Sequence, residues 1–334
     1  MARKNNNSNN HQKVVLVTGG AGYKGSTLVR ELLFKGYRVR VLDSLMYGGR
    51  AITPFFNHPN FDFLKGDIRK KTDVDSALDQ VTDVMHLAAI VGDKPCEKDP
   101  KLSVEINYDG TQILAEAASR HGVERLIFAS TCSNYGISDP SVPVSENGQL
   151  NPVSLYAELK IDCEKLLTDL ARKGKICTVC LRFSTAFGVS GRTRFDLTVN
   201  SFTFEALRDK KVIVFSEESW RPFSHVLDMA NIYQSMLQAP KEEIAGQIYN
   251  AGWNKQNYMK KDIINMIKEV IGDFEVDYIN TIEDRRSYRV DFTKIEKLLN
   301  LQVAMPLKKG IEEVASAIKT GLLTECDFEN NKLK

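Results

Sequence analysis

The segment SLYAELK carries the two side chains of this sequence that are best suited to catalysis. Tyr156 is followed four residues later by Lys160, and the apolar residues around them recur at helical spacing. Residues at positions i and i+4 share one face of a helix. Because a lysine ammonium favours the phenolate of a neighbouring tyrosine, the pair predicts a tyrosine that acts as a general base near neutral pH.

A cluster of polar side chains follows the apolar run at residues 125–130, which is typical of a strand. Its members carry hydroxyl, thiol or amide groups: Ser130, Thr131, Cys132, Ser133, Asn134 and Tyr135. Ligands of a doubly wound sheet bind at the C-terminal ends of its strands, so we expect these side chains to face a cofactor cleft. Taken singly, each hydroxyl is also compatible with capping of the strand end.

A glycine-rich segment, TGGAGYKG, lies between a valine-rich run and an amphipathic pattern. Gly19, Gly22 and Gly25 permit a tight turn, close approach of a pyrophosphate and close packing of helix on strand. The helix N-terminus offers unpaired N–H groups to the phosphates. Lys24 stands in a slot that is usually hydrophobic, and it lies either near the pyrophosphate or in solvent.

Asp43 follows at about the twenty-residue spacing expected of the acid that binds the adenosine ribose hydroxyls. A carboxylate at this position repels the extra phosphate of NADP, so the sequence favours NAD. The alternative is a solvated aspartate that opens a turn.

These residues need a parallel sheet to position them. Apolar runs at residues 13–18, 37–43, 61–64, 83–88, 125–130 and 176–183 alternate with helical patterns at 23–35, 72–80, 100–121 and 152–173. The pattern predicts an α/β fold of Rossmann type, with six parallel strands in doubly wound order and helices on both faces. Further helices are expected near 197–209, 226–238, 260–271 and 307–320. We therefore expect a disordered arm at 1–12, a dinucleotide-binding domain at 13–187 and a smaller α/β substrate-binding region at 188–334.

The composition excludes several classes of function. The 334 residues include 45 Lys and Arg and 43 Asp and Glu, so no strong field is available to hold nucleic acid or an anionic membrane. No run approaches the roughly 18 apolar residues of a membrane span, and a cytoplasmic protein is the default expectation. Cys177 and Cys180 could suggest a redox or zinc site, but residues three apart on a strand point to opposite faces, so a structural role is favoured and no metal is expected.

Taken together, these motifs resemble the extended short-chain dehydrogenase/reductase family of nucleotide-sugar enzymes, most closely its UDP-galactose 4-epimerase-like members. The resemblance rests on TGGAGYKG, Asp43, GDI at 66–68, HLAA at 86–89, STCSNYG at 130–136, YAELK and LRFSTAFG at 181–188, and it spans roughly residues 13–321. It implies a bound NAD, a nucleotide-diphosphate sugar as substrate and a homodimer.

The resemblance also implies three groups of site residues. The catalytic group is Thr131, Tyr156 and Lys160. The cofactor group is Gly19, Gly22, Tyr23, Lys24, Gly25, Asp43, Asp67, Ile68, Leu87, Ala88, Ala89, Asn107, Ser130 and Phe183. The substrate group is Cys132, Ser133, Thr185, Arg192, Asn200, Arg221, Arg286 and Tyr288. Asp67 and Ile68 would flank the adenine, Asn107 would support the lysine, and Arg221, Asn200 and Arg286 would bind the diphosphate, since the planar guanidinium matches phosphate oxygens.

The two residues after Thr131 bear on the reaction. In this family, dehydratases carry Asp and Glu there, and decarboxylases carry Glu at the second position, whereas this chain has Cys132 and Ser133. The pattern favours a 4-epimerase that oxidises carbon 4 of the sugar transiently. The alternatives are a keto-sugar reductase or dehydrogenase, a dehydratase in which Cys132 serves as the acid, and a non-catalytic dinucleotide sensor. Intact Thr131, Tyr156 and Lys160 argue against the last, and we favour a packing role for Cys132 because an ordinary thiol is protonated at neutral pH.

Overall fold

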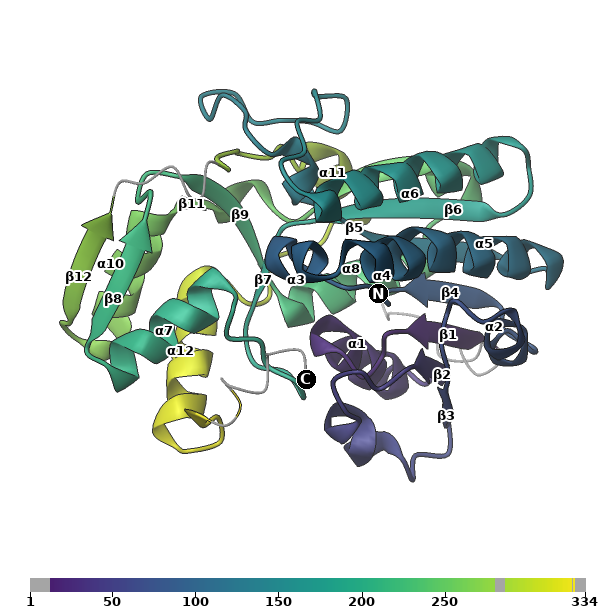
Figure 1. Ribbon diagram of the computed structural model, residues 1–334, viewed down its shortest axis with the longest axis horizontal. Coiled ribbons are helices and arrows are strands. Elements are labelled where there is room, and N and C mark those ends of the chain that lie inside the picture. Colours follow the sequence, from purple (N-terminus) through teal and green to yellow (C-terminus); the bar gives the residue numbers. More distant parts are fainter. Residues whose placement is uncertain (1–12, 280–285, 326, 328–334) are drawn as a thin grey trace, which may run out of the picture.

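A seven-stranded parallel sheet forms the centre of the molecule in the computed structural model, which describes residues 13–279, 286–325 and 327 (Figure 1). The strand order is β10-β6-β5-β4-β1-β2-β3. The strands are β1 Val14–Thr18, β2 Arg38–Asp43, β3 Phe61–Lys65, β4 Asp83–His86, β5 Arg125–Thr131, β6 Cys177–Phe183 and β10 Gln247–Ala251. The predicted Rossmann-type fold is confirmed, while the predicted arm at 1–12 lies outside the described residues.

The seventh strand was not predicted. Strand β10 pairs in parallel with β6, from Gln247 opposite Val179 to Ala251 opposite Phe183. It comes from the part of the chain beyond residue 188, as does α8 (Val226–Gln238), which packs beside α1 (Tyr23–Phe34). The second half of the chain therefore completes the central sheet as well as forming a region of its own.

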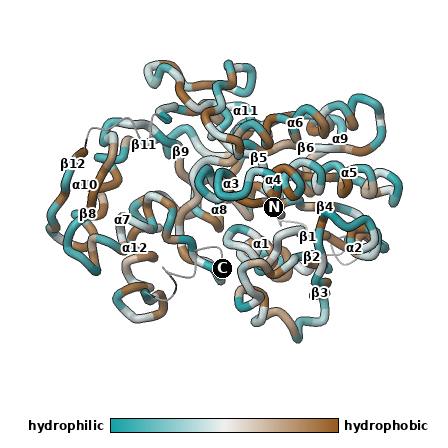
Figure 2. Tube along the Cα trace, viewed as in Figure 1, coloured by the Kyte–Doolittle hydropathy of each residue, from teal (hydrophilic) through white to brown (hydrophobic). Residues whose placement is uncertain are grey.

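Helices cover both faces of the sheet, and residues of each strand alternate between the two cores. Val15 and Val17 pack in one core with α1, α8 and α11 (Thr293–Leu299). Val14 and Leu16 pack in the other with α2 (Lys71–Ala77), α5 (Gly110–Arg120) and α6 (Leu155–Arg172). Brown and teal segments alternate along α5 and α6, as expected of helices that bury one side (Figure 2).

Cys177 and Cys180 of β6 contact these two different cores. The prediction that their side chains point to opposite faces is confirmed, and they are not arranged as a pair.

The predicted helix at 100–121 is divided into three segments. It consists of α4 (Pro100–Val104), a π-turn (Glu105–Asp109) and α5, and a short helix α3 (Asp93–Lys98) precedes it. Such π-turns occur frequently at functional sites. Asn107 lies in this turn and uses its amide to bind both backbone groups of Ile90, at 2.8 and 2.9 Å.

Two small sheets and three helices form the C-terminal region, at the left of Figure 1. One sheet contains β7 (Thr185–Phe187), β9 (Trp220–His225) and β11 (Asn257–Met259), and the other contains β8 (Lys211–Phe215) and β12 (Glu275–Ile279). The predicted helices appear as α7 (Thr198–Arg208), α10 (Lys260–Ile271) and α12 (Leu307–Lys319). The remaining helical segments are Arg50–Phe55, Cys132–Tyr135, α9 (Lys241–Ile244) and Asn254–Gln256. Within the described ranges, no helix is long and apolar enough to cross a membrane.

Candidate active site

The glycine turn between β1 and α1 is shaped for an anionic ligand. Gly19 has φ +72°, and a Cβ on it would lie 2.7 Å from the backbone nitrogen of Ala88. A Cβ on Gly25 would collide with the carbonyl oxygen of Gly19. The N-cap residue Gly22 offers no side chain to the helix, and the first turn holds no acidic residue. The turn therefore leaves both space and helix N–H groups for a pyrophosphate, which fits a dinucleotide.

Asp43, at the end of β2, is tied to this turn. Its Oδ2 accepts a hydrogen bond from the Ala21 backbone N–H at 3.0 Å, and its Oδ1 accepts one from Leu45 at 2.8 Å. Burial raises the pKa of Asp43, while these two bonds and the charge of Arg192 oppose the rise. The guanidinium carbon of Arg192 lies 3.9 Å from the centroid of the Tyr47 ring. The structure thus places Arg192, predicted to bind substrate, at the Asp43 end of the cleft.

The residues predicted to flank the adenine lie beyond β3. A hydrogen bond from Arg69, at 2.6 Å between Nη2 and Oδ2, lowers the pKa of Asp67. Ile68 is buried and packs closely against Gly110. A Cβ added to that glycine would lie 2.8 Å from the Ile68 side chain. Asp67 also lines a hollow of about 330 Å³ beside Glu105.

The three predicted catalytic residues come together at the C-terminal end of β5. Ser154 caps the start of α6, accepting a hydrogen bond from the Ala157 N–H at 3.4 Å, and so sets Tyr156 in the first turn. The Lys160 ammonium lies 5.9 Å from the centroid of the Tyr156 ring, and Tyr156 interacts with the Thr131 side chain. Thr131, Tyr156 and Lys160 are each less than 9% exposed. The site can therefore act on an alcohol held away from bulk water.

The electrostatics of Tyr156 differ from the prediction. Burial raises the pKa of Tyr156 well above its usual range, and the leading charge that opposes this is Arg194 rather than Lys160. Burial also lowers the pKa of Lys160, to about 8. Because both side chains are buried, the cost of burying a charge outweighs the attraction of a single neighbour.

Arg194 is a site residue that the sequence did not single out. Its guanidinium binds both carboxylate oxygens of Asp196, at 2.9 and 2.5 Å, and lies near Gly92. The sequence shows that this loop is rich in arginine, but it does not show toward which part of the protein the loop folds.

Lys24 points toward the end of β6. Its ammonium lies 5.1 Å from the centroid of the Phe183 ring, and Phe183 is the register partner of Thr131. Burial, followed by the charges of Lys160 and Arg194, lowers the pKa of Lys24 to about 7. The side chain is half-buried at the catalytic end of the sheet rather than free in solvent.

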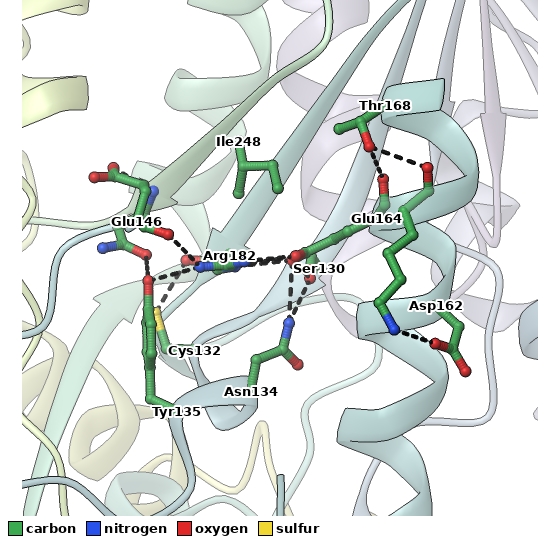
Figure 3. A network of polar contacts seen from close by, with 12 residues as sticks. Ser130, Cys132, Asn134, Tyr135, Glu146, Asp162, Glu164, Thr168, Arg182 and Ile248 are labelled. Carbon is green, nitrogen blue, oxygen red and sulfur yellow. Dashed lines mark hydrogen bonds and ion pairs between the residues drawn. The ribbon is translucent and has the colours of Figure 1, made fainter. Parts of the chain in front are cut away.

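A buried ion pair between Glu164 of α6 and Arg182 of β6 lies behind this site (Figure 3). Ser130 donates to Glu164 at 2.5 Å and Asn134 donates to it at 3.1 Å. The Tyr135 hydroxyl accepts from Arg182 at 3.0 Å and donates to the Oδ1 of Asn250 at 2.6 Å.

Four members of the polar cluster, Ser130, Cys132, Asn134 and Tyr135, thus contribute to a buried network. This differs from the prediction that they face the cleft. Cys132 donates from its Sγ to the Arg182 carbonyl at 3.0 Å, and burial raises its pKa far above its usual value, which supports a packing role.

Several predicted residues hold the protein's own backbone. Tyr23 donates from its hydroxyl to the Gly188 carbonyl at 2.7 Å. Asn200 accepts from the Gly188 N–H at 3.0 Å and donates to the Arg194 carbonyl at 2.9 Å. Both residues fix the loop that follows β7, although Tyr23 was predicted to bind the cofactor and Asn200 to bind the diphosphate. Leu87, Ala88 and Ala89 follow β4, and the Ala88 N–H donates to the Thr18 hydroxyl at 3.3 Å.

Arg221, Ser133 and Arg286, three of the residues predicted for substrate, lie around Tyr288. Arg221 of β9 places its guanidinium carbon 5.0 Å from the Tyr288 ring centroid. The side chain of Ser133 interacts with Tyr288, which is 2% exposed. Arg286 forms an ion pair with Asp93 at 2.8 Å. Thr185, in β7, is half-buried.

A parallel sheet with an uncapped glycine turn, an aspartate at the end of its second strand and a buried tyrosine–lysine pair defines a dinucleotide-dependent enzyme that acts on alcohols or carbonyls. The family model described as "NAD dependent epimerase/dehydratase family" matches residues 15–252. The chain therefore belongs to the NAD-dependent epimerase/dehydratase family, and NAD is the cofactor of that family.

Relatives and solved structures agree with this assignment. The chain is 28% identical to a putative UDP-glucose 4-epimerase of Methanocaldococcus jannaschii, over 92% of this chain and 98% of that one. It is 27% identical to UDP-glucuronic acid decarboxylase 1 of Xenopus tropicalis, over 92% of this chain and 72% of that one. The UDP-glucose 4-epimerase of Thermus thermophilus in complex with NAD has a TM-score of 0.80 at 27% identity, covering 92% of this chain and 99% of that one. The UDP-glucuronic acid 4-epimerase of Bacillus cereus, in complex with UDP-glucuronic acid and NAD, has a TM-score of 0.82 at 28% identity and the same coverage.

Proposed function

We propose that the protein is a nucleotide-sugar 4-epimerase, which oxidises carbon 4 of an NDP-hexose transiently and returns the hydride to the opposite face. The observation that carries the proposal is the combination of Thr131, Tyr156 and Lys160 with a buried Cys132. Elimination and decarboxylation need a further acid or base beside the reacting carbon. Cys132 is bonded to a backbone carbonyl, and Asp93, a carboxylate that acts on Tyr156, is paired with Arg286.

The residues have separate tasks in this proposal. Bound NAD supplies a hydride acceptor. The glycine turn and the start of α1 hold its pyrophosphate, and Asp43 binds its adenosine ribose. Tyr156, assisted by Thr131, takes the proton of the sugar hydroxyl, and the charges of Arg194 and Lys160 stabilise the phenolate. Arg221 and Arg286 bind the diphosphate of the substrate.

The names of the relatives support this class of reaction, but they differ in the sugar of the substrate. Four are named as UDP-glucose 4-epimerases, one of them as putative. Other matches act on UDP-glucuronic acid according to their names. We therefore propose UDP-hexoses as the first substrates to test and UDP-glucuronic acid as the second. The family resemblance also supports a homodimer formed through α5 and α6, which light scattering of the purified protein would test.

The test begins with the purified protein. Mass spectrometry of small molecules released on denaturation should identify NAD. The protein should then be incubated with UDP-glucose, UDP-galactose and UDP-glucuronic acid, and the products separated. A product of unchanged mass and inverted configuration at carbon 4 supports the proposal. Loss of water or carbon dioxide, or stoichiometric accumulation of NADH, would instead identify a dehydratase, a decarboxylase or a dehydrogenase.

A further inference from the structure

Lys24 begins in the cofactor-binding turn and ends beside the catalytic residues. It lies in the first turn of α1, directly after the glycines, yet its ammonium reaches the Phe183 ring at 5.1 Å. Phe183 ends β6 and is paired in register with Thr131. Across the described part of the chain, the Lys24 ammonium has no hydrogen-bond acceptor and no carboxylate partner, and it lies over the Phe183 ring.

The charge of Lys24 adds to that of Lys160. The Lys160 ammonium contacts the Phe128 ring at 4.4 Å, and it too has no acidic partner within the described ranges. Arg194, the third cation nearby, is neutralised by Asp196. Within the described residues neither ammonium group forms an ion pair, although Glu164 favours the charge of Lys160 from farther away. Two such charges at the catalytic end of the sheet are costly in a buried setting without a compensating role.

In the proposed reaction, a positive charge at Lys24 affects the transfer of hydride to the nicotinamide. A hydride acceptor must lie within reach of the alcohol held by Tyr156, and so close to Lys160 and Phe183. When the sugar alcohol is oxidised, its carbon gives a hydride with both electrons to the nicotinamide of NAD, and its hydroxyl proton passes to Tyr156. The nicotinamide ring is cationic before this transfer and neutral after it. A fixed positive charge nearby therefore disfavours the oxidised ring relative to the reduced one.

We propose that Lys24 is a second cationic residue of the hydride-transfer site, whose charge makes the bound nicotinamide a stronger hydride acceptor. This inference rests on the proposed NAD-dependent oxidation. A lysine at this point of the glycine turn holds the enzyme closer to its reduced, keto-sugar state than a hydrophobic residue would. At an assumed separation of about 10 Å and an effective dielectric constant of about 20, one charge would change the oxidised-to-reduced equilibrium by roughly tenfold.

The test is the redox equilibrium of the bound cofactor, followed by the near-ultraviolet absorbance of NADH. At pH 6, below the pKa of about 7 to which burial lowers Lys24, so that the side chain carries its charge, wild type, Lys24→Met and Lys24→Arg are each loaded with NAD and equilibrated with the same redox couple of known potential. Lys24→Met, which has a similar volume and no charge, should hold roughly tenfold less NADH relative to NAD, equivalent to about 30 mV for this two-electron couple. Lys24→Arg, which keeps the charge, should stay close to wild type.

Three results separate the possible outcomes. An unchanged ratio in Lys24→Met overturns the inference, including the case in which both redox forms lose affinity equally because Lys24 binds a cofactor phosphate. A fall in Lys24→Arg as large as that in Lys24→Met also overturns it, because shape rather than charge would then be responsible. If wild-type protein neither binds NAD nor reduces it with a sugar nucleotide, the proposed function fails, and Lys24 loses its role with it.

Discussion

Replacing Glu164 by Gln should destabilise the protein strongly without touching the cleft. Glu164 accepts hydrogen bonds from Arg182 Nε at 2.9 Å and Nη2 at 2.7 Å. Ser130 and Asn134 donate to the same carboxylate, and the Glu164 and Arg182 side chains are each 3% exposed (Figure 3). A neutral amide keeps the shape of the side chain but leaves the Arg182 cation buried without a counter-charge.

The expected cost follows from that geometry. Removing one partner of a buried ion pair typically costs about 3–5 kcal/mol. Arg182 retains hydrogen bonds to Tyr135 and to the Glu146 carbonyl, so we expect the lower end, about 3 kcal/mol. Replacing both partners with apolar residues, as in Glu164→Leu with Arg182→Met, should cost less than the sum of the two single changes, because no unpaired charge remains.

The measurement is urea unfolding, read as a shift in midpoint at constant slope. The matched control is Asp162→Asn on the same helix. The pair of Asp162 with Lys165 spans 3.0 Å but is largely exposed, and its loss should cost less than about 0.5 kcal/mol. If Glu164→Gln unfolds within that same small margin of wild type, the buried network does not carry the stability assigned to it.

Four further experiments test the site itself. Asp43→Ala should weaken NAD binding about tenfold and reduce discrimination against NADP, as measured by calorimetry; tighter binding of NADP than of NAD to wild type would overturn the assignment. Tyr156→Phe should lower kcat by roughly 10²- to 10⁴-fold while NAD remains bound, and wild-type turnover would remove Tyr156 from its role. Burial lowers the pKa of Lys160 to about 8, so its ammonium is present below that pH and lost above it, and kcat/KM should fall as pH rises through 8; a flat alkaline profile would contradict this. Alkylation of the native protein should modify the half-buried Cys177 and spare Cys132, which is 1% exposed, and early labelling of Cys132 by mass spectrometry would reopen its role as an acid.

The sheet and the catalytic helix were predictable because their signals are local. The glycine turn, the valine-rich β1 and the apolar spacing around Tyr156 each fall within one element. Strand β10 was missed because its place depends on pairing with β6, about seventy residues away along the chain.

The orientation of polar side chains was harder to predict. Successive residues of a strand point to opposite faces, so Ser130 and Thr131 could not both face one cleft. The prediction for the polar cluster at residues 130–135 did not include that alternation. The positions of Arg192 and Asn200 depend on how the loop after β7 folds back toward Tyr47 and Tyr23, and no local pattern encodes that path.

The central claim is that the Tyr156 site oxidises carbon 4 of a nucleotide sugar and then reduces it again without releasing the hydride. It is tested most directly with a UDP-hexose that carries deuterium at carbon 4, incubated with the NAD-loaded protein and followed by proton nuclear magnetic resonance. The proposal predicts a product of unchanged mass whose anomeric proton signal has moved to that of the carbon-4 epimer, with deuterium retained at carbon 4 and no net NADH. A new methyl signal from a deoxy-keto sugar, a loss of mass, or NADH formed in proportion to product would contradict it.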